Sequence, residues 1–464
     1  MTSASLADKA PGADLNLLGE PLAPIRGVGL PGALATNILN MIGVGPFITI
    51  PLALAAMGGP QAMLGWLLGA VLCVCDGLVW AELGSAMPRS GGPYHYLREA
   101  FGPRSLGRLF SFIFLWQSLL IGPLSIASGA VGLAQYAGYL APHLGHWGLT
   151  GLAAAVCLAN TALLWRDVRS IQTLSVVVTV AVVGATIWIV LSGAAHFDPH
   201  IAFDFPKGAF TLTPAFWTGL GASTLIAVYD YGGYNNVCLI GDEVKNPARV
   251  IPLTVLASIA IVAALYLGLN LAILGVLPWR VAAHSSAVVA DFMQRIYGAW
   301  GGVLVSLLIL VASWGSALAV LLGFSRVPYA AAASGRFFKP FAALHPKGRF
   351  PTLGLLYMGL LSALACFFSL ADLIAVLIVI QTMFQFVAQC VAVILLRRRS
   401  SGPAGAFRMP FYPWPALITL IGWLGIVATS QFKHIAIAAA MLAAGVVLYL
   451  VQAQRQGNWP FRRA

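Results

Sequence analysis

Two short stretches of glycine, proline and polar residues interrupt otherwise apolar segments of the sequence. The first is Asn40-Met41-Ile42-Gly43-Val44-Gly45-Pro46-Phe47, and the second is Tyr229-Asp230-Tyr231-Gly232-Gly233-Tyr234-Asn235. In the first, two glycines permit a non-helical turn, and the proline suits the start of a new helix because its fixed φ is already helical. Each stretch therefore predicts a break in a helix, with backbone groups left free to bind a ligand.

These backbone groups predict a pocket for a small zwitterion. Free amides of Gly43, Val44 and Gly45 would lie at the N-terminus of a new helix, where the helix dipole favours a carboxylate. The second segment runs the opposite way and ends near Tyr231, so its unpaired carbonyls suit an ammonium. Such a pocket fits an α-amino acid, whereas in the alternative interpretation the glycines only allow close helix packing. The predicted substrate-binding residues all belong to the two breaks: Ile42, Gly43, Val44, Gly45, Tyr229, Asp230, Tyr231, Gly232, Gly233 and Asn235.

Three acidic residues stand inside or at the ends of apolar segments. Asp76 lies mid-segment, where a carboxylate costs about 2.5–3.5 kcal/mol on insertion scales, so we expect a proton-coupling or cation-facing site. Its alternative role is that of a neutral acid hydrogen-bonded into the bundle. Asp230 is expected either to contact a substrate ammonium or to face an outer vestibule. Glu82 lies at a segment end, where pairing with a basic residue of an inner loop is expected.

The elements that position these groups follow from composition. The 464 residues are 59% hydrophobic and only 9% charged, against about 25% charged in soluble domains. This balance excludes an ordinary soluble enzyme and predicts an all-α polytopic membrane protein. The net charge of +12 resides in short loops between apolar blocks, so it does not indicate a nucleic-acid partner.

Segments of about 20 apolar residues predict twelve transmembrane helices. Their ranges are 31–56, 61–87, 106–139, 147–165, 171–193, 213–240, 250–276, 301–324, 351–369, 372–396, 413–430 and 434–453. With this topology, Lys207, Arg280, Arg295 and Lys433 are outside, and the other 22 of the 26 Lys and Arg residues are inside. Because basic residues favour the cytoplasmic side, both termini are predicted to be cytoplasmic in a plasma membrane, with the short tails suggesting a bacterial inner membrane.

The two interruptions fall in the first and sixth helices, five helices apart. Matched Gly/Pro-interrupted segments at the head of two five-helix units predict an inverted-repeat transporter. The predicted organisation is a cytoplasmic tail (1–29), a transport core (30–396) made of two repeats (30–195 and 210–396), two peripheral helices (397–453) and a second tail (454–464).

Three motifs carry a family resemblance. The segments Ile42–Phe47, Ala81–Gly102 and Tyr231–Pro247 resemble the first-helix, inner-loop and sixth-helix signatures of the amino acid–polyamine–organocation (APC) superfamily. The third is closest to that of the L-type amino-acid exchangers. The resemblance implies a LeuT-like fold with discontinuous helices 1 and 6 and transport by alternating access. It also places Tyr229 at an aromatic gate over the substrate, the alternative being an aromatic packed against a neighbouring helix.

The resemblance also bears on ion coupling. Several permeases of this superfamily carry a fifth-helix lysine in place of sodium, and Thr179 stands at that position here, so this device is absent. Ser313 and Ser316 lie near the place where sodium-coupled relatives bind the ion, although serine in a membrane helix more often bonds its own backbone. Asp76 aligns with a glutamate of the plant polyamine uptake transporters.

A further polar feature is the row Gln381, Gln385 and Gln389, spaced at i, i+4 and i+8. Residues so spaced share one helix face. The row predicts either a contact between helices or the wall of a cavity.

We therefore predict a secondary active transporter of amino acids that is proton-coupled or works by exchange. A polyamine or cationic amino-acid proton symporter is one alternative, and a non-transporting amino-acid sensor on the same scaffold is another. No ATP-binding, zincin or serine-hydrolase motif is present, so no enzyme activity and no cofactor are expected. Expected partners are the substrate, membrane lipid and a proton or sodium co-ion. A disulfide-linked heavy chain is not expected, since the loop 141–146 has no cysteine.

Overall fold

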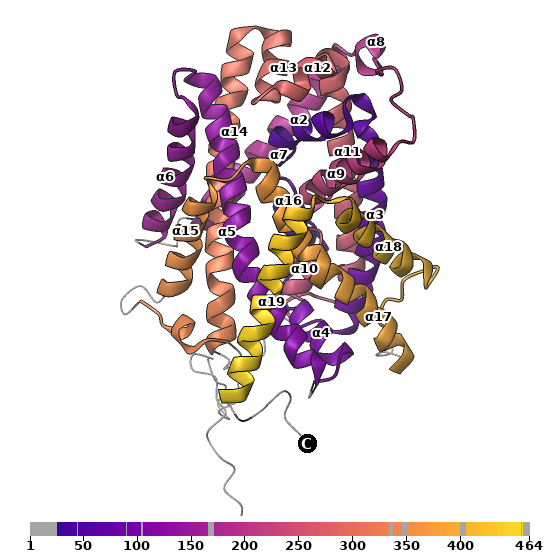
Figure 1. Ribbon diagram of the computed structural model, residues 1–464, viewed down its shortest axis with the longest axis vertical. Helices are drawn as coiled ribbons and strands as arrows, with labels where there is room; N and C mark the ends of the chain where they lie inside the picture. The colour runs from indigo at the N-terminus through magenta and orange to yellow at the C-terminus, as the bar shows by residue number, and fades with distance from the viewer. Residues whose placement is uncertain are drawn as a thin grey trace, which may run out of the picture.

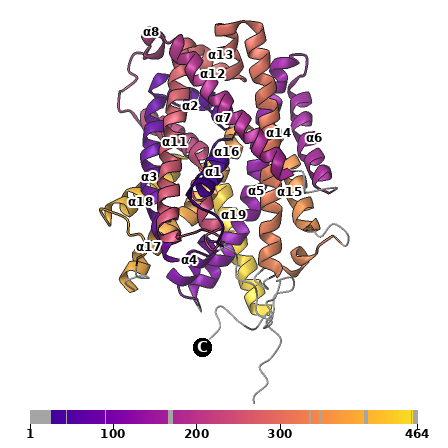
Figure 2. The same ribbon diagram turned by 180° about the vertical axis from the view of Figure 1, so that it is seen from behind.

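The computed structural model describes residues 26–43, 45–89, 91–103, 105–165, 171–333, 337–345, 350–399, 405–455 and 457, without the side chains of 171–179 and 333. Its described part is helical, with two isolated β-bridges and no strand (Figures 1 and 2). The long helices are α1 (Leu30–Met41), α2 (Gly45–Met57), α3 (Met63–Ala86), α5 (Leu106–Leu140), α6 (His146–Leu164), α7 (Ile171–Ala195), α9 (Pro214–Tyr231), α11 (Pro247–Val276), α14 (Ala299–Ala333), α15 (Thr352–Ala365), α16 (Leu370–Gln381), α17 (Val387–Arg399), α18 (Trp414–Thr429) and α19 (Phe432–Arg455).

The shorter elements join these helices or cover their ends. They are α4 (Pro93–Ala100), α8 (Pro199–Ala202), α10 (Asn236–Leu239), α12 (Trp279–His284), α13 (Val288–Tyr297), the 3₁₀ turns η1 (Pro60–Ala62) and η2 (Lys339–Ala342), and the π-turn η3 (Thr382–Phe386). Proline is the first residue of α4, α8, α9 and α11, a position where its missing N–H costs no hydrogen bond.

Each of the twelve predicted segments overlaps one of these helices or a run of consecutive ones. By length and apolar composition, seven helices of the described chain qualify as membrane spans, or eight if α1 and α2 count as one. Three further apolar helices of the described chain are shorter: Val180–Ala195 of α7, Thr352–Ala365 (α15) and Trp414–Thr429 (α18). Multiple spans are thus confirmed, and the count of twelve stays a prediction.

Both predicted breaks are present. A bend of 49° separates α1 from α2, and α9 ends at Tyr231 with α10 resuming at Asn236. A third irregularity, η3, lies in the middle of the tenth segment and was not predicted. Such π-turns often mark functional positions in helices.

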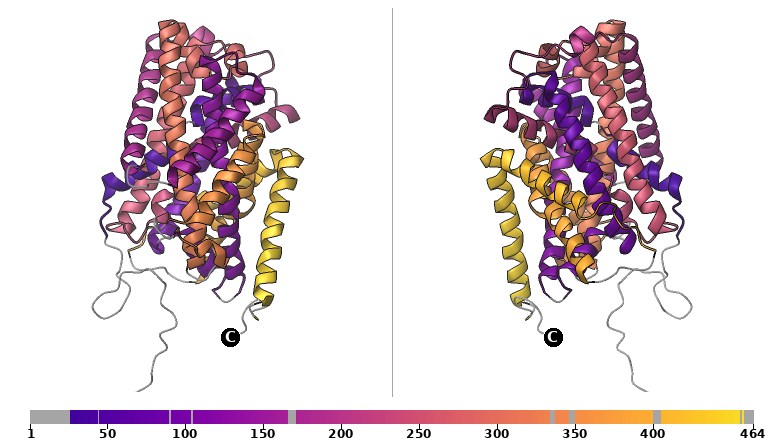
Figure 3. Two further views of the ribbon diagram at one scale, coloured as in Figure 1. Left: turned by 90° about the vertical axis from the view of Figure 1, so that its left-hand side faces the viewer. Right: turned by 90° about the vertical axis from the view of Figure 1, so that its right-hand side faces the viewer.

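The bundle has two distinct ends (Figure 1). One end, here called the basic end, carries α4 and the last turns of α17 and α19, with Arg397, Arg398, Arg399 and Arg455. The opposite end is covered by α8, α12 and α13. Figure 3 shows α19 at the edge of the bundle. Large apolar side chains such as Trp147 and Phe432 are exposed on the surface, as burial in lipid requires.

Candidate substrate site

A cavity of about 840 Å³ lies between the two breaks. Its wall contains Ile42, Gly43 and Gly45 from the first break and Tyr229, Asp230, Gly232, Gly233 and Asn235 from the second. Eight of the ten predicted substrate-binding residues are therefore brought together. Val44 lies outside the described residues, and the Tyr231 side chain lies outside the cavity, stacked on Tyr266 with ring centroids 5.9 Å apart.

The two breaks meet most closely at Gly45 and Asp230. A Cβ atom at Gly45 would lie 2.2 Å from Asp230 Oδ1, so any side chain there would collide with the carboxylate. Thr49, one turn along α2, donates its hydroxyl to Asp230 Oδ2 at 2.5 Å. Asp230 is 3% exposed, and its Oδ1 has no hydrogen-bond partner within the described structure. A buried carboxylate oxygen without a partner is costly, and a bound cation would satisfy it.

A second close approach fixes the other side of the breaks. Gly233 has φ +115°, and a Cβ there would lie 3.0 Å from the Asn40 carbonyl oxygen. Both the backbone conformation and the close contact therefore require glycine at this position. Asn37 of α1 donates to the Tyr234 carbonyl and accepts from the Val237 N–H at 2.9 Å. The Asn37 side chain thus provides the cap that the start of α10 lacks, and it ties α1 to the second break.

The first break is less open than the sequence predicts. The Gly43 amide, expected to be free, donates to the Met41 carbonyl at 3.1 Å. Tyr266 of α11 donates its hydroxyl to the same carbonyl at 2.7 Å. The chain turns sharply here, and this local bond satisfies an amide that helix geometry leaves without a partner. Gly45 is the first residue of α2, where a backbone amide has no intrahelical acceptor.

The cavity is closed toward the α12–α13 end. Tyr229 shares a 2.8 Å hydrogen bond with Ser128 of α5, and Tyr136 donates to the Phe47 carbonyl at 2.7 Å. Toward the basic end the cavity wall continues to Pro93 and His95 of α4. None of the described lining residues comes from α8, α12 or α13. The cavity therefore leads from the breaks toward the basic end.

Asp76 lies on α3 outside the cavity, fully buried. Tyr234 donates its hydroxyl to Asp76 Oδ2 at 2.6 Å, and Trp423 of α18 donates Nε1–H to Oδ1 at 3.2 Å. Tyr234 itself lines the cavity. The Trp423 ring stacks on Phe386 of η3, with centroids 4.4 Å apart. Asp76 thus connects α3, the second break and a helix that the repeat prediction places outside the transport core.

The two serines predicted to take part in ion coupling have different environments. Ser313 donates to the Ile309 carbonyl at 2.7 Å, which is the backbone bond given as its alternative role. Ser316 lines the cavity, and its Oγ would lie 3.6 Å from a Cβ at Gly43. The Thr179 side chain is not described. Within the described chain no group of three or more His, Cys, Asp or Glu residues could hold a metal ion.

The glutamine row is split by η3. Gln381 and Gln385 line the cavity, whereas Gln389 is fully buried elsewhere. Gln117 of α5 donates to the Gln385 side chain. Both predicted roles therefore occur: Gln381 and Gln385 form part of the cavity wall, and Gln385 also makes a contact between helices.

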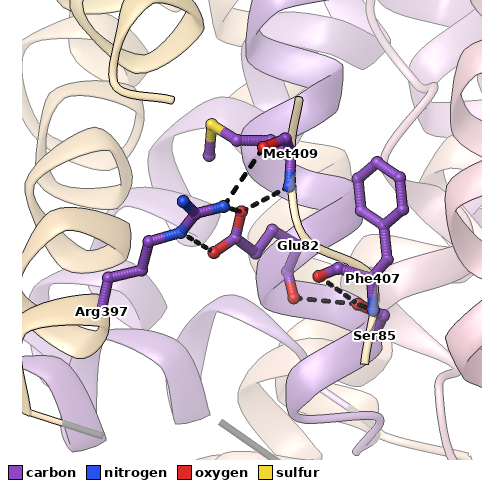
Figure 4. Close-up of polar contacts among 5 residues, drawn as sticks. All are labelled: Glu82, Ser85, Arg397, Phe407 and Met409. Carbon is purple, nitrogen blue, oxygen red and sulfur yellow. Dashed lines mark hydrogen bonds and ion pairs between the residues drawn. The ribbon is translucent and has the colours of Figure 1, made fainter. Parts of the chain in front are cut away.

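Glu82 pairs as expected, with Arg397 at the end of α17 (Figure 4). Arg397 donates from Nε and Nη2 to the carboxylate, which also accepts the Met409 N–H at 2.8 Å. Ser85, one turn along α3, accepts the Phe407 N–H at 3.1 Å. This contact ties the end of α3 to the connection between α17 and α18 at the basic end.

Sequence reasoning missed four residues of the site: Asn37, Thr49, Tyr266 and Trp423. Each is polar or amphipathic and lies in an apolar helix, which is a weak signal in a sequence with 13 Trp and 13 Tyr. Their roles depend on partners in distant helices, and Asn37 alone could have been singled out, as a buried amide three residues before the first break.

Comparison with known proteins gives the family. The family model described as amino acid permease matches residues 29–456. The chain is 27% identical to the serine/threonine exchanger SteT of Bacillus subtilis, over 85% of this chain and 89% of that one. It is 29% identical to human cationic amino acid transporter 4, over 81% of this chain and 60% of that one. It is 23% identical to the branched-chain amino acid permease BcaP of Bacillus subtilis, over 93% of this chain and 92% of that one.

The matched region contains both breaks, Asp76 and the cavity, and it extends through α19. The relatives are transporters and not enzymes. The chain therefore belongs to the amino acid permease family of the APC superfamily, whose members have the LeuT-like fold, and it is a multi-pass membrane protein of amino acid transport.

Proposed function

We propose that this protein is a proton-coupled amino acid transporter of the plasma membrane that works by alternating access. The observation that carries the proposal is the cavity that joins the two breaks, whose wall includes Asp230, a carboxyl with one buried oxygen (Oδ1) that has no hydrogen-bond partner among the described residues. An amine group of the substrate fits there, because a buried anion without a partner is stabilised strongly by a cation.

The proposed orientation places the basic end in the cytoplasm, following the bias of Lys and Arg toward that side. In this orientation the cavity leads to the cytoplasm, and the Tyr229–Ser128 and Tyr136–Phe47 contacts close it toward the outside. The structure would then correspond to an inward-facing state of the transport cycle, and outward opening would require both contacts to separate.

The proton-coupling group in this proposal is Asp76. In the structure both of its oxygens accept hydrogen bonds, an arrangement that suits the carboxylate. The indole N–H of Trp423 can only donate, whereas the hydroxyl of Tyr234 can donate or accept. Protonation of Asp76 would therefore reverse the bond to Tyr234. Since Tyr234 belongs to the second break, the proton and the substrate would act on the same segment.

The experiment is uptake into sodium-free proteoliposomes of labelled neutral, cationic and acidic amino acids, with and without an inward proton gradient. Stimulation of one class by the gradient is the expected result. Uptake that requires preloaded substrate and ignores the gradient would replace proton coupling by exchange. Absence of uptake under all conditions, with sodium also tested, would favour the sensor.

A specific observation favours a second candidate, a transporter of polyamines or cationic amino acids. Asp230 Oδ1 lies against Gly45 at the N-terminus of α2, where the substrate carboxylate was expected. Two carboxylates at one helix end repel each other. A substrate with no carboxylate would avoid this repulsion, and the second amine of a dibasic amino acid would offset it. Putrescine and lysine in the same uptake panel distinguish this candidate from a neutral amino acid.

A further inference from the structure

A groove separate from the substrate cavity lies at the basic end between α17 and α18. It has a volume of about 630 Å³ and is lined by Ile394, Arg397, Arg398, Tyr412, Pro413 and Leu417. Arg397 and Arg398 form its polar part, and Ile394 and Leu417 form its aliphatic wall. No lining residue is shared with the substrate cavity.

The cationic part of the groove is held in place by the contact shown in Figure 4. Arg397 donates from Nε and Nη2 to Glu82, and its guanidinium lies 4.0 Å from the centre of the Tyr412 ring. Nη2 also donates to the Met409 carbonyl at 3.3 Å, and Nη1 forms no hydrogen bond with the described residues. Arg398 is exposed and forms no ion pair with the described residues. The groove therefore presents donors of fixed position beside one solvent-accessible positive charge.

The residues beside the groove are of the kind found at a membrane–water interface. Phe411 is 81% exposed and Trp414 is 66% exposed, and both stand where α18 begins. Exposed aromatic residues at helix ends gather at the level of lipid headgroups. Ile394 and Leu417, both partly exposed, extend the groove along α17 and α18.

We propose that this groove binds an anionic glycerophospholipid. Its phosphate would bind Arg398 and the Nη1 of Arg397, and an acyl chain would lie along Ile394 and Leu417. The charge selects an anionic headgroup, because basic pockets between helices on the cytoplasmic side attract such lipids. The apolar wall selects a lipid over a free phosphate, which would leave Leu417 and Ile394 in contact with water.

The test is native mass spectrometry of the purified full chain, titrated with phosphatidylglycerol or phosphatidylcholine. The wild-type protein is expected to retain at least one phosphatidylglycerol that phosphatidylcholine does not displace. Arg398→Gln is expected to lower its affinity about fivefold, since each basic residue at a membrane surface contributes about 1 kcal/mol. Arg398→Lys keeps the charge and is expected to retain most of the binding.

Two controls separate this site from general attraction to a basic surface. Arg455→Gln removes a charge from the same end, on α19, and is expected to leave the retained lipid unchanged. Leu417→Gln is expected to weaken lipid binding while binding of inorganic phosphate stays the same. Equal loss in Arg455→Gln and Arg398→Gln, or displacement of the lipid by millimolar inorganic phosphate, would overturn the proposal.

Discussion

The two buried aspartates of the bundle have opposite environments. Asp76 accepts hydrogen bonds on both oxygens and does not touch the cavity. Asp230 has one oxygen bonded to Thr49 and one without a partner, and it lines the cavity. The sequence places Asp76 in the middle of an apolar segment and Asp230 at a break, but it does not give the hydrogen-bond partners of either acid.

This difference suits the two carboxyls to the two tasks of a coupled transporter, which are to bind a proton and to bind the substrate. A carboxyl whose donors all come from the protein changes its contacts when it is protonated, whether or not substrate is present. A carboxyl in a cavity wall whose buried oxygen has no partner in the protein can gain that partner from a ligand. We therefore assign the proton to Asp76 and the substrate amine to Asp230, and the predictions below separate these roles.

The largest effect is expected from crowding Asp230. In Gly45→Ala the new methyl group would collide with Oδ1 and displace the carboxylate from the cavity wall. Uptake is expected to fall about a hundredfold, the loss typical when a reacting or binding group moves by about 1 Å. Gly425→Ala is the matched control, since a Cβ there meets nothing within 4 Å. Normal uptake by Gly45→Ala would refute the close contact of the two breaks.

Removing the charge of Asp230 is expected to have the next largest effect. Asp230→Asn keeps the bond from Thr49 and loses the attraction for an amine, so substrate affinity should fall about thirtyfold. The response to a proton gradient, measured at saturating substrate, should persist. If the variant bound substrate normally but lost the gradient response, the assignment of the two aspartates would have to be exchanged.

A smaller effect is expected from Tyr234→Phe, which removes the hydroxyl between Asp76 and the second break and keeps the ring. Stimulation of uptake by an inward proton gradient should fall about tenfold, because a hydrogen bond to a charged group is lost. Substrate affinity should change less. Tyr139→Phe removes a hydroxyl bonded to Gln294 near the opposite end and serves as control. Equal behaviour of the two variants would contradict a coupling role for Tyr234.

The smallest effect is expected from Trp423→Phe. This change removes the weaker donor to Asp76, at 3.2 Å, and leaves an aromatic ring to stack on Phe386. The pH at which uptake is half-maximal should shift, and the gradient response should fall about threefold. An unchanged pH profile would show that α18 takes no part in coupling.

The helical class, the two breaks and the pairing of Glu82 with a basic residue at its end of the bundle could be predicted from the sequence. Apolar runs and Gly/Pro interruptions are local properties of the chain, and the Arg397 bond follows from charge and topology. The partners of Asp76 and Asp230 could not be predicted, because Trp423 and Thr49 reach them from segments far away in the sequence. The hydrogen bond from the Gly43 amide to the Met41 carbonyl depends on the backbone conformation of the turn, which composition does not determine.

The π-turn illustrates the same limit. The spacing of Gln381, Gln385 and Gln389 assumes a regular helix, and one wider turn at Thr382–Phe386 directs the last of them away from the cavity. The extra residue in that turn also brings Phe386 onto Trp423, which in turn contacts Asp76. No local sequence pattern marks this rearrangement.

The most direct test of the division between the two acids is Asp76→Asn in proteoliposomes, with exchange and proton-driven uptake measured on the same preparation. The expected result is exchange of preloaded substrate close to the wild-type rate, with no stimulation by an inward proton gradient and no dependence of uptake on pH. If Asp76→Asn kept both gradient-stimulated uptake and its pH dependence, Asp76 would not be the proton site, and the central claim would be wrong.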